Sequence, residues 1–251
     1  MSEIIKKLAN PPIVEAVLDI DCDMPPMPDW TTLKESAQKA YQDHYPHFQN
    51  MSHGTIQIEG PPGGPQTQGA LRRITSLQFF QEDRKQLVQV RSLGYSFNRL
   101  APYSTLDDYL PEIERTWKLF VDIAGPKLIR SIRLNYINRI ALPITNQRVL
   151  IGKYFKVSPQ LPDESDLSFT GFLNQHSAVE NSTGNQANIL LTALPNEADK
   201  LPIILDIAVV HREDREPDSW DWIAENVRSL RNLKNRIFKN TLSDVGLSLF
   251  Q

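Results

Sequence analysis

The chain has little of what marks secreted, membrane-spanning or nucleic-acid-coating proteins. Cys22 is the only cysteine among 251 residues, so no disulfide can form within the chain and a small disulfide-stapled scaffold is excluded. The 27 Lys and Arg residues nearly balance 30 Asp and Glu residues, and the net charge of −3 gives no general attraction to nucleic acid or membrane surfaces. No apolar run approaches the roughly 20 residues needed to cross a bilayer, and none resembles a signal peptide. We therefore expect a cytoplasmic protein without membrane contact.

Complete catalytic motifs are also missing from the sequence. Neither the Gly-x-Ser-x-Gly pattern of hydrolases nor the Gly-x-Gly-x-x-Gly pattern of dinucleotide-binding folds occurs. Residues 60–65 are rich in glycine and proline but lack the Gly-Lys-Ser/Thr ending of a phosphate-binding loop, so they predict a simple connection. His44 and His47 are close in sequence, yet Pro46 disrupts the helix that would align them on a metal. The sequence therefore predicts no catalytic residue, no metal ion and no cofactor.

Hydrophobic patterning predicts the same order of elements twice along the chain. Apolar residues make up 40% and charged residues 23%, which is typical of a folded globular protein. The first half predicts a strand over 14–21, a helix over 29–44, strands over 55–59, 73–81 and 86–97, and a helix over 104–124. The second half predicts a strand over 131–142, a shorter helix over 149–155, strands over 168–175, 188–194 and 203–211, and a helix over 219–242.

Each half therefore shows the order β-α-β-β-β-α, and we predict a tandem duplication with units at 1–126 and 127–251. Each unit can lay its helices on one face of an antiparallel sheet, and joining the two sheets edge to edge removes two exposed edges. The expected fold is α+β, with one curved antiparallel sheet and helices on one face. This arrangement resembles the TATA-binding-protein-like and helix-grip folds, a likeness of topology that fixes no function.

Four blocks of sequence carry a resemblance to a known family. They are residues 12–20 (PIVEAVLDI), 95–103 (YSFNRLAPY), 133–140 (RLNYINRI) and 205–207 (LDI). Together they resemble a sporadically distributed family of bacterial proteins that has no assigned activity, and the closing helix extends the resemblance over nearly the whole chain. A patchy distribution implies horizontally transferred accessory genes, which suggests a toxin–antitoxin or phage-defence setting. The resemblance supplies no catalytic residues.

Polar residues on the two opening strands form the main candidate site. If these strands lie side by side at the centre of the sheet, acidic and basic rows face each other opposite the helices, and other strands add to the same face. The candidate binding residues are Glu15, Asp19, Arg91, Arg133, Asn135, Arg139 and Asp206. The arginine side chains could grip a phosphate, a carboxylate or a partner side chain. The simpler interpretation is a cross-strand ion-pair ladder that fixes the register of the sheet.

The closing helix is acidic at its start and basic at its end. Its last turns carry Arg228, Arg231, Lys234, Arg236 and Lys239. A nucleic-acid-binding protein would use such residues on phosphates, but the helix macrodipole favours the same distribution of charge. We therefore expect these residues to stabilise the helix rather than to form a binding site.

The leading hypothesis is a non-catalytic binding or regulatory protein of an accessory bacterial system, which recognises a protein partner through the open face of the sheet. A homodimer through exposed edge strands is an alternative assembly. The alternative function is a small-ligand-binding protein or enzyme with a pocket in the curved sheet, in which Arg133, Arg139, Glu15 and Asp206 orient an anionic ligand. Direct nucleic-acid binding is a third hypothesis, and the net charge disfavours it.

Overall fold

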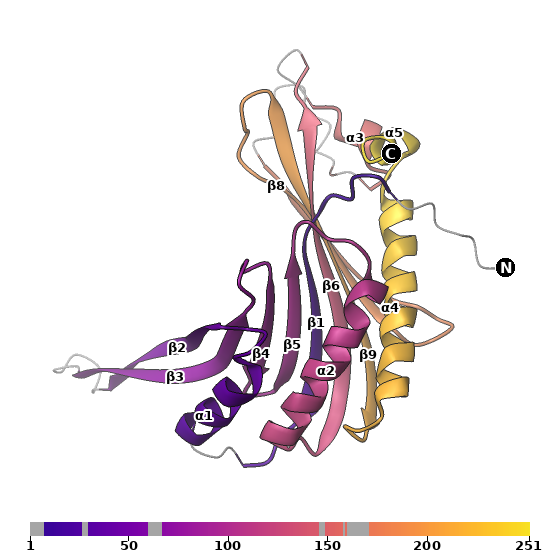
Figure 1. The fold of residues 1–251 in the computed structure, drawn as a ribbon. Coiled ribbons are helices and arrows are strands. Elements are labelled where there is room, and N and C mark those ends of the chain that lie inside the picture. The colour runs from indigo at the N-terminus through magenta and orange to yellow at the C-terminus, as the bar shows by residue number, and fades with distance from the viewer. Residues whose placement is uncertain (1–7, 27–29, 60–66, 146–148, 158, 160–170) are drawn as a thin grey trace.

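The computed structural model of the chain describes residues 8–26, 30–59, 67–145, 149–157, 159 and 171–251 (Figure 1). Within these residues, nine strands form one antiparallel sheet in the order β2-β3-β4-β5-β1-β6-β9-β8-β7. The strands are β1 (Ile13–Asp23), β2 (His47–Glu59), β3 (Thr67–Phe80), β4 (Gln86–Arg91), β5 (Gly94–Leu100), β6 (Leu128–Pro143), β7 (Leu173–Val179), β8 (Gln186–Ala193) and β9 (Lys200–Arg215). The helices are α1 (Trp30–Tyr41), α2 (Leu106–Ala124), α3 (Ile151–Tyr154), α4 (Trp220–Thr241) and α5 (Asp244–Ser248). The predicted α+β class with one continuous antiparallel sheet is confirmed.

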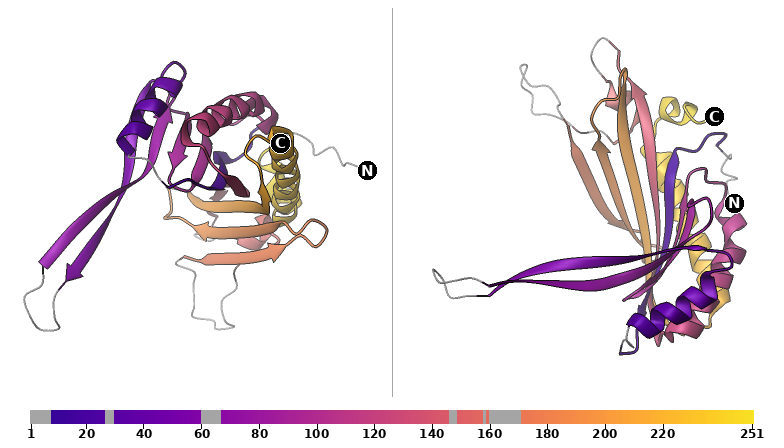
Figure 2. Two further views of the ribbon diagram at one scale, coloured as in Figure 1. Left: turned by 90° about the horizontal axis from the view of Figure 1, so that it is seen from below. Right: turned by 60° about the vertical axis from the view of Figure 1, so that its left-hand side comes forward.

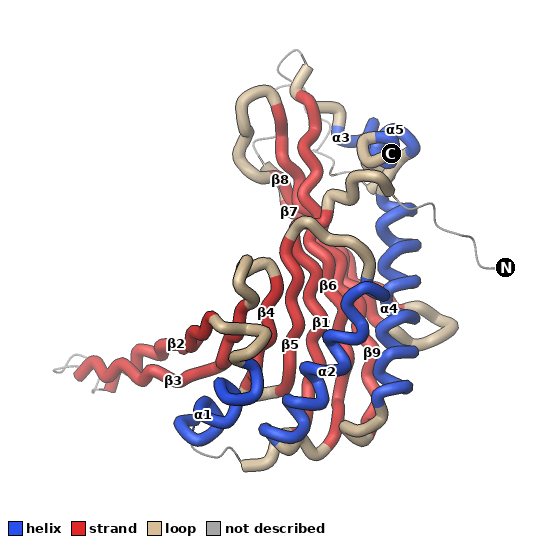
Figure 3. The backbone as a smooth tube through the Cα atoms, viewed as in Figure 1, coloured by secondary structure: helices blue, strands red, loops and turns tan. Residues whose placement is uncertain are grey.

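The long helices α1, α2 and α4 all lie against one face of this sheet, and the other face is open (Figure 3). Alternation along β1 decides which side chains face the helices: Ala16, Leu18 and Ile20 are buried, and the residues between them point to the open face. Helix α2 begins at a capping box formed by Thr105 and ends at Gly125 in the left-handed conformation. Among the described helices, none combines the length and the apolar character that a membrane span needs.

The opening strands of the two halves, β1 and β6, are direct neighbours at the centre of the sheet. Val17 lies opposite Asn135 and Asp19 lies opposite Arg133, which confirms the expected placement of these strands side by side. The rest of the first half, β5, β4, β3 and β2, continues the sheet on one side of this pair. The rest of the second half, β9, β8 and β7, continues it on the other.

One prediction for the first half is wrong. Residues 86–97, predicted as a single strand, form the hairpin β4–β5, so that half has four strands between its helices instead of three. The alternation of apolar residues continues across the turn, so the pattern gives no sign that the strand ends there. Gly94 is the local signal: its φ is 143°, and a Cβ there would lie 2.1 Å from the carbonyl oxygen of Ile20.

The sheet extends beyond its helical layer at the β2–β3 hairpin. Strand β3 pairs with β4 only from Ser76 to Phe80, and the remaining length of β2 and β3 is paired only with each other. Figure 2 shows this hairpin reaching away from the rest of the molecule. The helix predicted over 149–155 is the short α3. Two other predictions lie outside the described residues: the beginning of the predicted strand, 168–170, and the predicted loop at 60–65.

Candidate functional site

The open face of the sheet, opposite α1, α2 and α4, collects the polar side chains of the central strands. Because β1 buries its even-numbered residues, Glu15, Asp19 and Asp21 project to this face. Residues directly opposite one another in neighbouring strands share a face, so Arg133 and Asn135 on β6 join them there. Asp206 on β9 and Arg139 on β6 also point to the open face, because the register places them opposite Ile137 and Ile204 respectively. Arg91 on β4 joins them, because it lies opposite Gly94, which lies opposite Asp21, so all seven predicted binding residues share one face.

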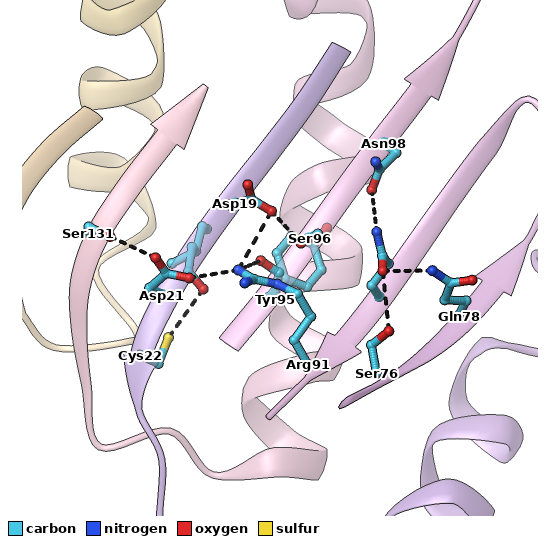
Figure 4. A network of polar contacts seen from close by, with 12 residues as sticks. Asp19, Asp21, Cys22, Ser76, Gln78, Arg91, Tyr95, Ser96, Asn98 and Ser131 are labelled. Atoms are coloured by element: carbon cyan, nitrogen blue, oxygen red, sulfur yellow. Dashed lines mark hydrogen bonds and ion pairs between the residues drawn. The ribbon is translucent and has the colours of Figure 1, made fainter. Parts of the chain in front are cut away.

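Arg91 forms the centre of an ionic cluster with Asp19 and Asp21 (Figure 4). Its Nη2 lies 2.8 Å from Oδ1 of Asp21 and 3.6 Å from Oδ1 of Asp19. Arg91 on β4 reaches across β5 to β1 because the residue between them is Gly94, which has no side chain in the way. Ser96 on β5 donates to Asp19, and the cluster thus connects three strands.

This cluster extends to β6, since the hydroxyl of Ser131 donates to Oδ2 of Asp21 over 3.1 Å. The side chains of Arg91 and Asp19 are only 24% and 21% exposed, so they hold their geometry away from bulk solvent. Arg91 and Asp19, two of the candidate binding residues, therefore bind other side chains of the sheet, as expected for a cross-strand ion-pair ladder.

A row of hydrogen-bonded side-chain amides, the amide ladder, crosses the open face from strand to strand. The Nε2 group of Gln49 donates to Gln78 over 2.6 Å, Gln78 to Gln89 over 2.9 Å, and Gln89 to Oδ1 of Asn98 over 3.0 Å. The Nδ2 group of Asn98 then donates to Oε1 of Glu15 over 2.8 Å. Each link joins neighbouring strands, so the ladder runs from β2 to β1 and ends on a carboxylate. Hydrogen bonds aligned in one direction polarise one another and stabilise the row.

The ladder was missed at the level of sequence. Gln49, Gln78, Gln89 and Asn98 carry no motif, and their spacing along the chain shows nothing unusual. Only the register of β2 to β5 reveals that they stand in one row, and register is set by pairing across distant strands.

The centre of the open face holds a second group, made of Arg133, Asn135 and Asp206. Asp206 is half-buried, and this burial raises the pKa of its carboxyl. The charge of Arg133 and a hydrogen bond with Asn135 act on that pKa in the opposite direction, while Glu15 raises it further. Within the described residues, Oδ1 of Asn135 and Oδ1 of Asp206 are buried without a hydrogen-bond partner.

Arg133 differs from the other central arginine. Its side chain is exposed, and in the described part of the chain it makes no hydrogen bond or ion pair. A guanidinium offers five N–H donors in a fixed plane. The middle of the open face therefore presents one cation with free donors, placed between the carboxylates of Asp19 and Asp206.

Arg139 is not part of this central group. It lies six residues beyond Arg133 on the same strand, which is about 20 Å at the usual rise of a strand. There it forms an ion pair with Glu197, in the segment that precedes β9. The predicted residues thus separate into an ionic cluster at Arg91, a central group at Arg133 and a peripheral ion pair at Arg139.

The open face carries both charges in similar number. On the described central strands its acidic residues include Glu15, Asp19, Asp21 and Asp206, and its basic residues include Arg91, Arg133, Arg139, Lys200 and Arg212. In the described ranges, no group of three or more His, Cys, Asp or Glu side chains is placed to hold a metal ion. The arrangement is suited to binding charged and hydrogen-bonding groups.

Comparison with models of known protein families finds no match for this chain, and a search of curated protein sequences finds none either.

Proposed function

We propose that the chain is a non-catalytic binding or regulatory protein that recognises a protein partner through the open face of its sheet. The observation that carries this proposal is Arg133, an exposed guanidinium without a partner among the described residues, at the middle of a face whose other side chains are held in place. Arginine side chains of this kind are enriched among the residues that dominate the free energy of binding at protein interfaces.

Rigid surroundings support this role for Arg133. The amide ladder from Gln49 to Glu15 and the cluster around Arg91 immobilise the side chains beside it. A surface that is ordered before binding loses little conformational entropy when the partner arrives.

The balance of charge favours a protein over a nucleic acid as the partner. Binding to a phosphate backbone depends on neutralisation by Lys and Arg, and the described part of the open face carries acidic residues beside its basic ones. Proteins carry both charges, and complementary pairing of acidic and basic groups gives specificity at their interfaces.

We also propose that the fold arose by duplication. On one side of the central pair the order is β5, β4, β3, and on the other side it is β9, β8, β7, so each half adds its strands outward in reverse chain order. Under this proposal β2 is an additional strand of the first half. The TATA-binding-protein-like or helix-grip-like likeness is proposed on the same topology.

The resemblance of residues 12–20, 95–103, 133–140 and 205–207 to a sporadically distributed bacterial family extends the proposal to physiology. We infer that the chain serves as a neutralising or sensing component of an accessory system of the toxin–antitoxin or phage-defence kind. Each of these four blocks contains at least one residue of the open face, among them Glu15, Asn98, Arg133 and Asp206.

The experiment compares the wild type with Arg133→Gln and with Arg228→Gln. Arg228 is an exposed arginine on α4, on the other side of the sheet, and serves as the matched control. Each tagged protein is purified from cells of its native source at near-native salt, and the recovered protein is then purified and titrated against all three. We expect Arg133→Gln to weaken binding by about tenfold or more, and Arg228→Gln to leave it unchanged.

Two outcomes would contradict the proposal. One is a partner that binds Arg133→Gln as tightly as the wild type. The other is recovery of nucleic acid alone, with an affinity that falls steeply as salt is added. Sedimentation analysis identifies the case in which the partner is a second copy of the chain.

A further inference from the structure

A cavity of about 990 Å³ lies on the helix side of the sheet, away from the open face. It is bounded by the N-terminal segment that precedes β1, the start of α2, strand β6 and the C-terminal half of α4, which lie close together in Figure 1. The N–H group of Asn10 donates to the carbonyl of Phe250 over 3.2 Å, so the two ends of the described chain meet beside the cavity. This volume is typical of a small-molecule site.

Lys234 lines this cavity and is buried, which corrects the expectation that it simply belongs to a basic helix end. Its residue is only 7% exposed. It occupies a position in the apolar stripe of α4, three residues before Ile237 and four after Leu230. Its Nζ lies 3.7 Å from the centroid of the Tyr136 ring, a cation–π contact on the floor of the cavity.

No anion compensates this amine in the described part of the chain. Lys234 forms neither a hydrogen bond nor an ion pair there, and the α2 carboxylate that lines the cavity, Asp107, is paired with Arg231 at 2.6 Å. The hydroxyl groups of Tyr103 and Tyr136 are 2.8 Å apart, and burial raises both pKa values, that of Tyr136 to about 12, so both stay neutral.

Apart from Asp107, which is paired with Arg231, the other charged side chains that line the cavity are cationic. Arg231 is one turn before Lys234 on α4, and Lys239 lines the cavity further along the same helix. Burial, together with the charge of Arg231, lowers the pKa of Lys234 to about 7. The amine therefore gains or loses its proton near neutral pH.

The remaining walls are largely apolar. Leu8, Ile13, Phe238 and Leu247 surround the space next to Lys234. A ligand that fills this cavity needs a hydrocarbon or aromatic body against these side chains and a negative charge beside the amine.

We propose that this cavity binds a small molecule with an anionic head group and an apolar body, and that the Nζ group of Lys234 holds the head group against the ring of Tyr136. This site is separate from the open face, and its proposed ligand does not depend on any protein partner. Carboxylates and phosphates share the required chemistry.

Calorimetric titration of the full chain with octanoate, octyl phosphate and 1-octanol tests the proposal. We expect saturable binding of at least one of the two anions, and binding of the uncharged alcohol that is weaker by about tenfold or more. The preferred anion distinguishes a carboxylate ligand from a phosphate ligand. Lys234→Met should weaken binding of the anion by a similar factor, whereas Lys39→Met, which changes an exposed lysine of α1, should leave it unchanged.

A second measurement uses only the wild type. An anion beside Lys234 favours its charged form, so binding near neutral pH should be accompanied by proton uptake, and this uptake should become smaller as the pH is lowered. Titration in buffers of different ionisation enthalpy measures the uptake. The proposal is overturned if neither anion binds saturably, if octanol binds as tightly as the anions, if Lys234→Met binds like the wild type, or if binding takes up no proton at neutral pH.

Discussion

Replacing Lys234 with methionine should stabilise the protein, and the gain should depend on pH. Methionine has a similar length, fits an apolar helix position and makes favourable contacts with aromatic rings. It removes a cation that is buried without a counter-charge among the described residues, in contact with the ring of Tyr136. The variant therefore tests whether this amine is as poorly solvated as its position indicates.

The size of the effect follows from the pKa of Lys234, which falls from an ordinary value of 10.5 to about 7 in the folded protein. At about 1.4 kcal/mol per pH unit, this difference corresponds to about 5 kcal/mol of destabilisation when the amine is charged in both states. The cation–π contact with Tyr136 returns about 0.5 to 2 kcal/mol. At about pH 6 we therefore expect Lys234→Met to be more stable than the wild type by about 3 kcal/mol or more.

The direction of the pH dependence follows from the number of protons bound by each state. Below pH 7 the amine is protonated in both states, and the folded wild type carries the full penalty. Between about pH 7 and 10.5 the unfolded chain binds more protons than the folded protein, so the unfolding free energy of the wild type rises with pH. The advantage of the methionine variant is therefore largest in acid and disappears as the pH approaches 10.5.

Urea unfolding followed by tryptophan fluorescence at about pH 6, 7.5 and 9 measures this difference, since Trp117 is buried and reports on the core. Taking wild type minus variant removes the contribution of other titrating groups. Lys39→Met should show no such dependence, because Lys39 is exposed. A constant difference across this pH range, or a variant less stable than the wild type at pH 6, would refute the reasoning.

Three further changes test the sheet. Gln89→Leu removes one hydrogen bond from each of the two neighbouring amides of the ladder, Gln78 and Asn98, and should lower the unfolding free energy by about 1 to 3 kcal/mol, measured by urea titration. Gly94→Ala combines an unfavourable φ of 143° with a 2.1 Å clash against backbone, and we expect it to lower the thermal midpoint markedly, whereas Gly184→Ala has open space around the added carbon and should do less harm. Asp206→Asn removes a carboxyl whose pKa is raised by burial. In the wild type, this carboxyl stabilises the folded state in acid, and the stabilisation is lost as the pH rises through the pKa of the folded protein. As the pH rises above about 3.8, the ordinary pKa of an aspartate, the unfolding free energy of the wild type should therefore fall relative to that of the variant, and equal slopes in the two proteins would contradict the assignment.

Much of the layer structure could be predicted from local pattern. Alternation along β1 and β6, and helical spacing along α2 and α4, identify which side chains face the core, because burial of apolar surface acts on each element separately. The same patterns led to the correct expectation that the two opening strands meet at the centre of one sheet. Over residues 86–97 the alternation of apolar residues continues through the turn between β4 and β5. The pattern therefore predicted one strand where the structure has two.

Local pattern was enough to identify which residues are buried or exposed within most elements, the antiparallel sheet with helices on one face, and part of the set of polar residues that this sheet displays. The folded sheet was needed to show which of those residues meet, and it revealed the amide ladder. Arg91 reaches Asp21 across 70 positions of the chain, and Asn98 reaches Glu15 across 83. Such contacts depend on strand register, which the packing of the whole sheet sets. The burial of Lys234 was decided in the same way, because a charged residue in an apolar stripe stays in the core only when the surrounding elements leave it a cavity and an aromatic ring to contact.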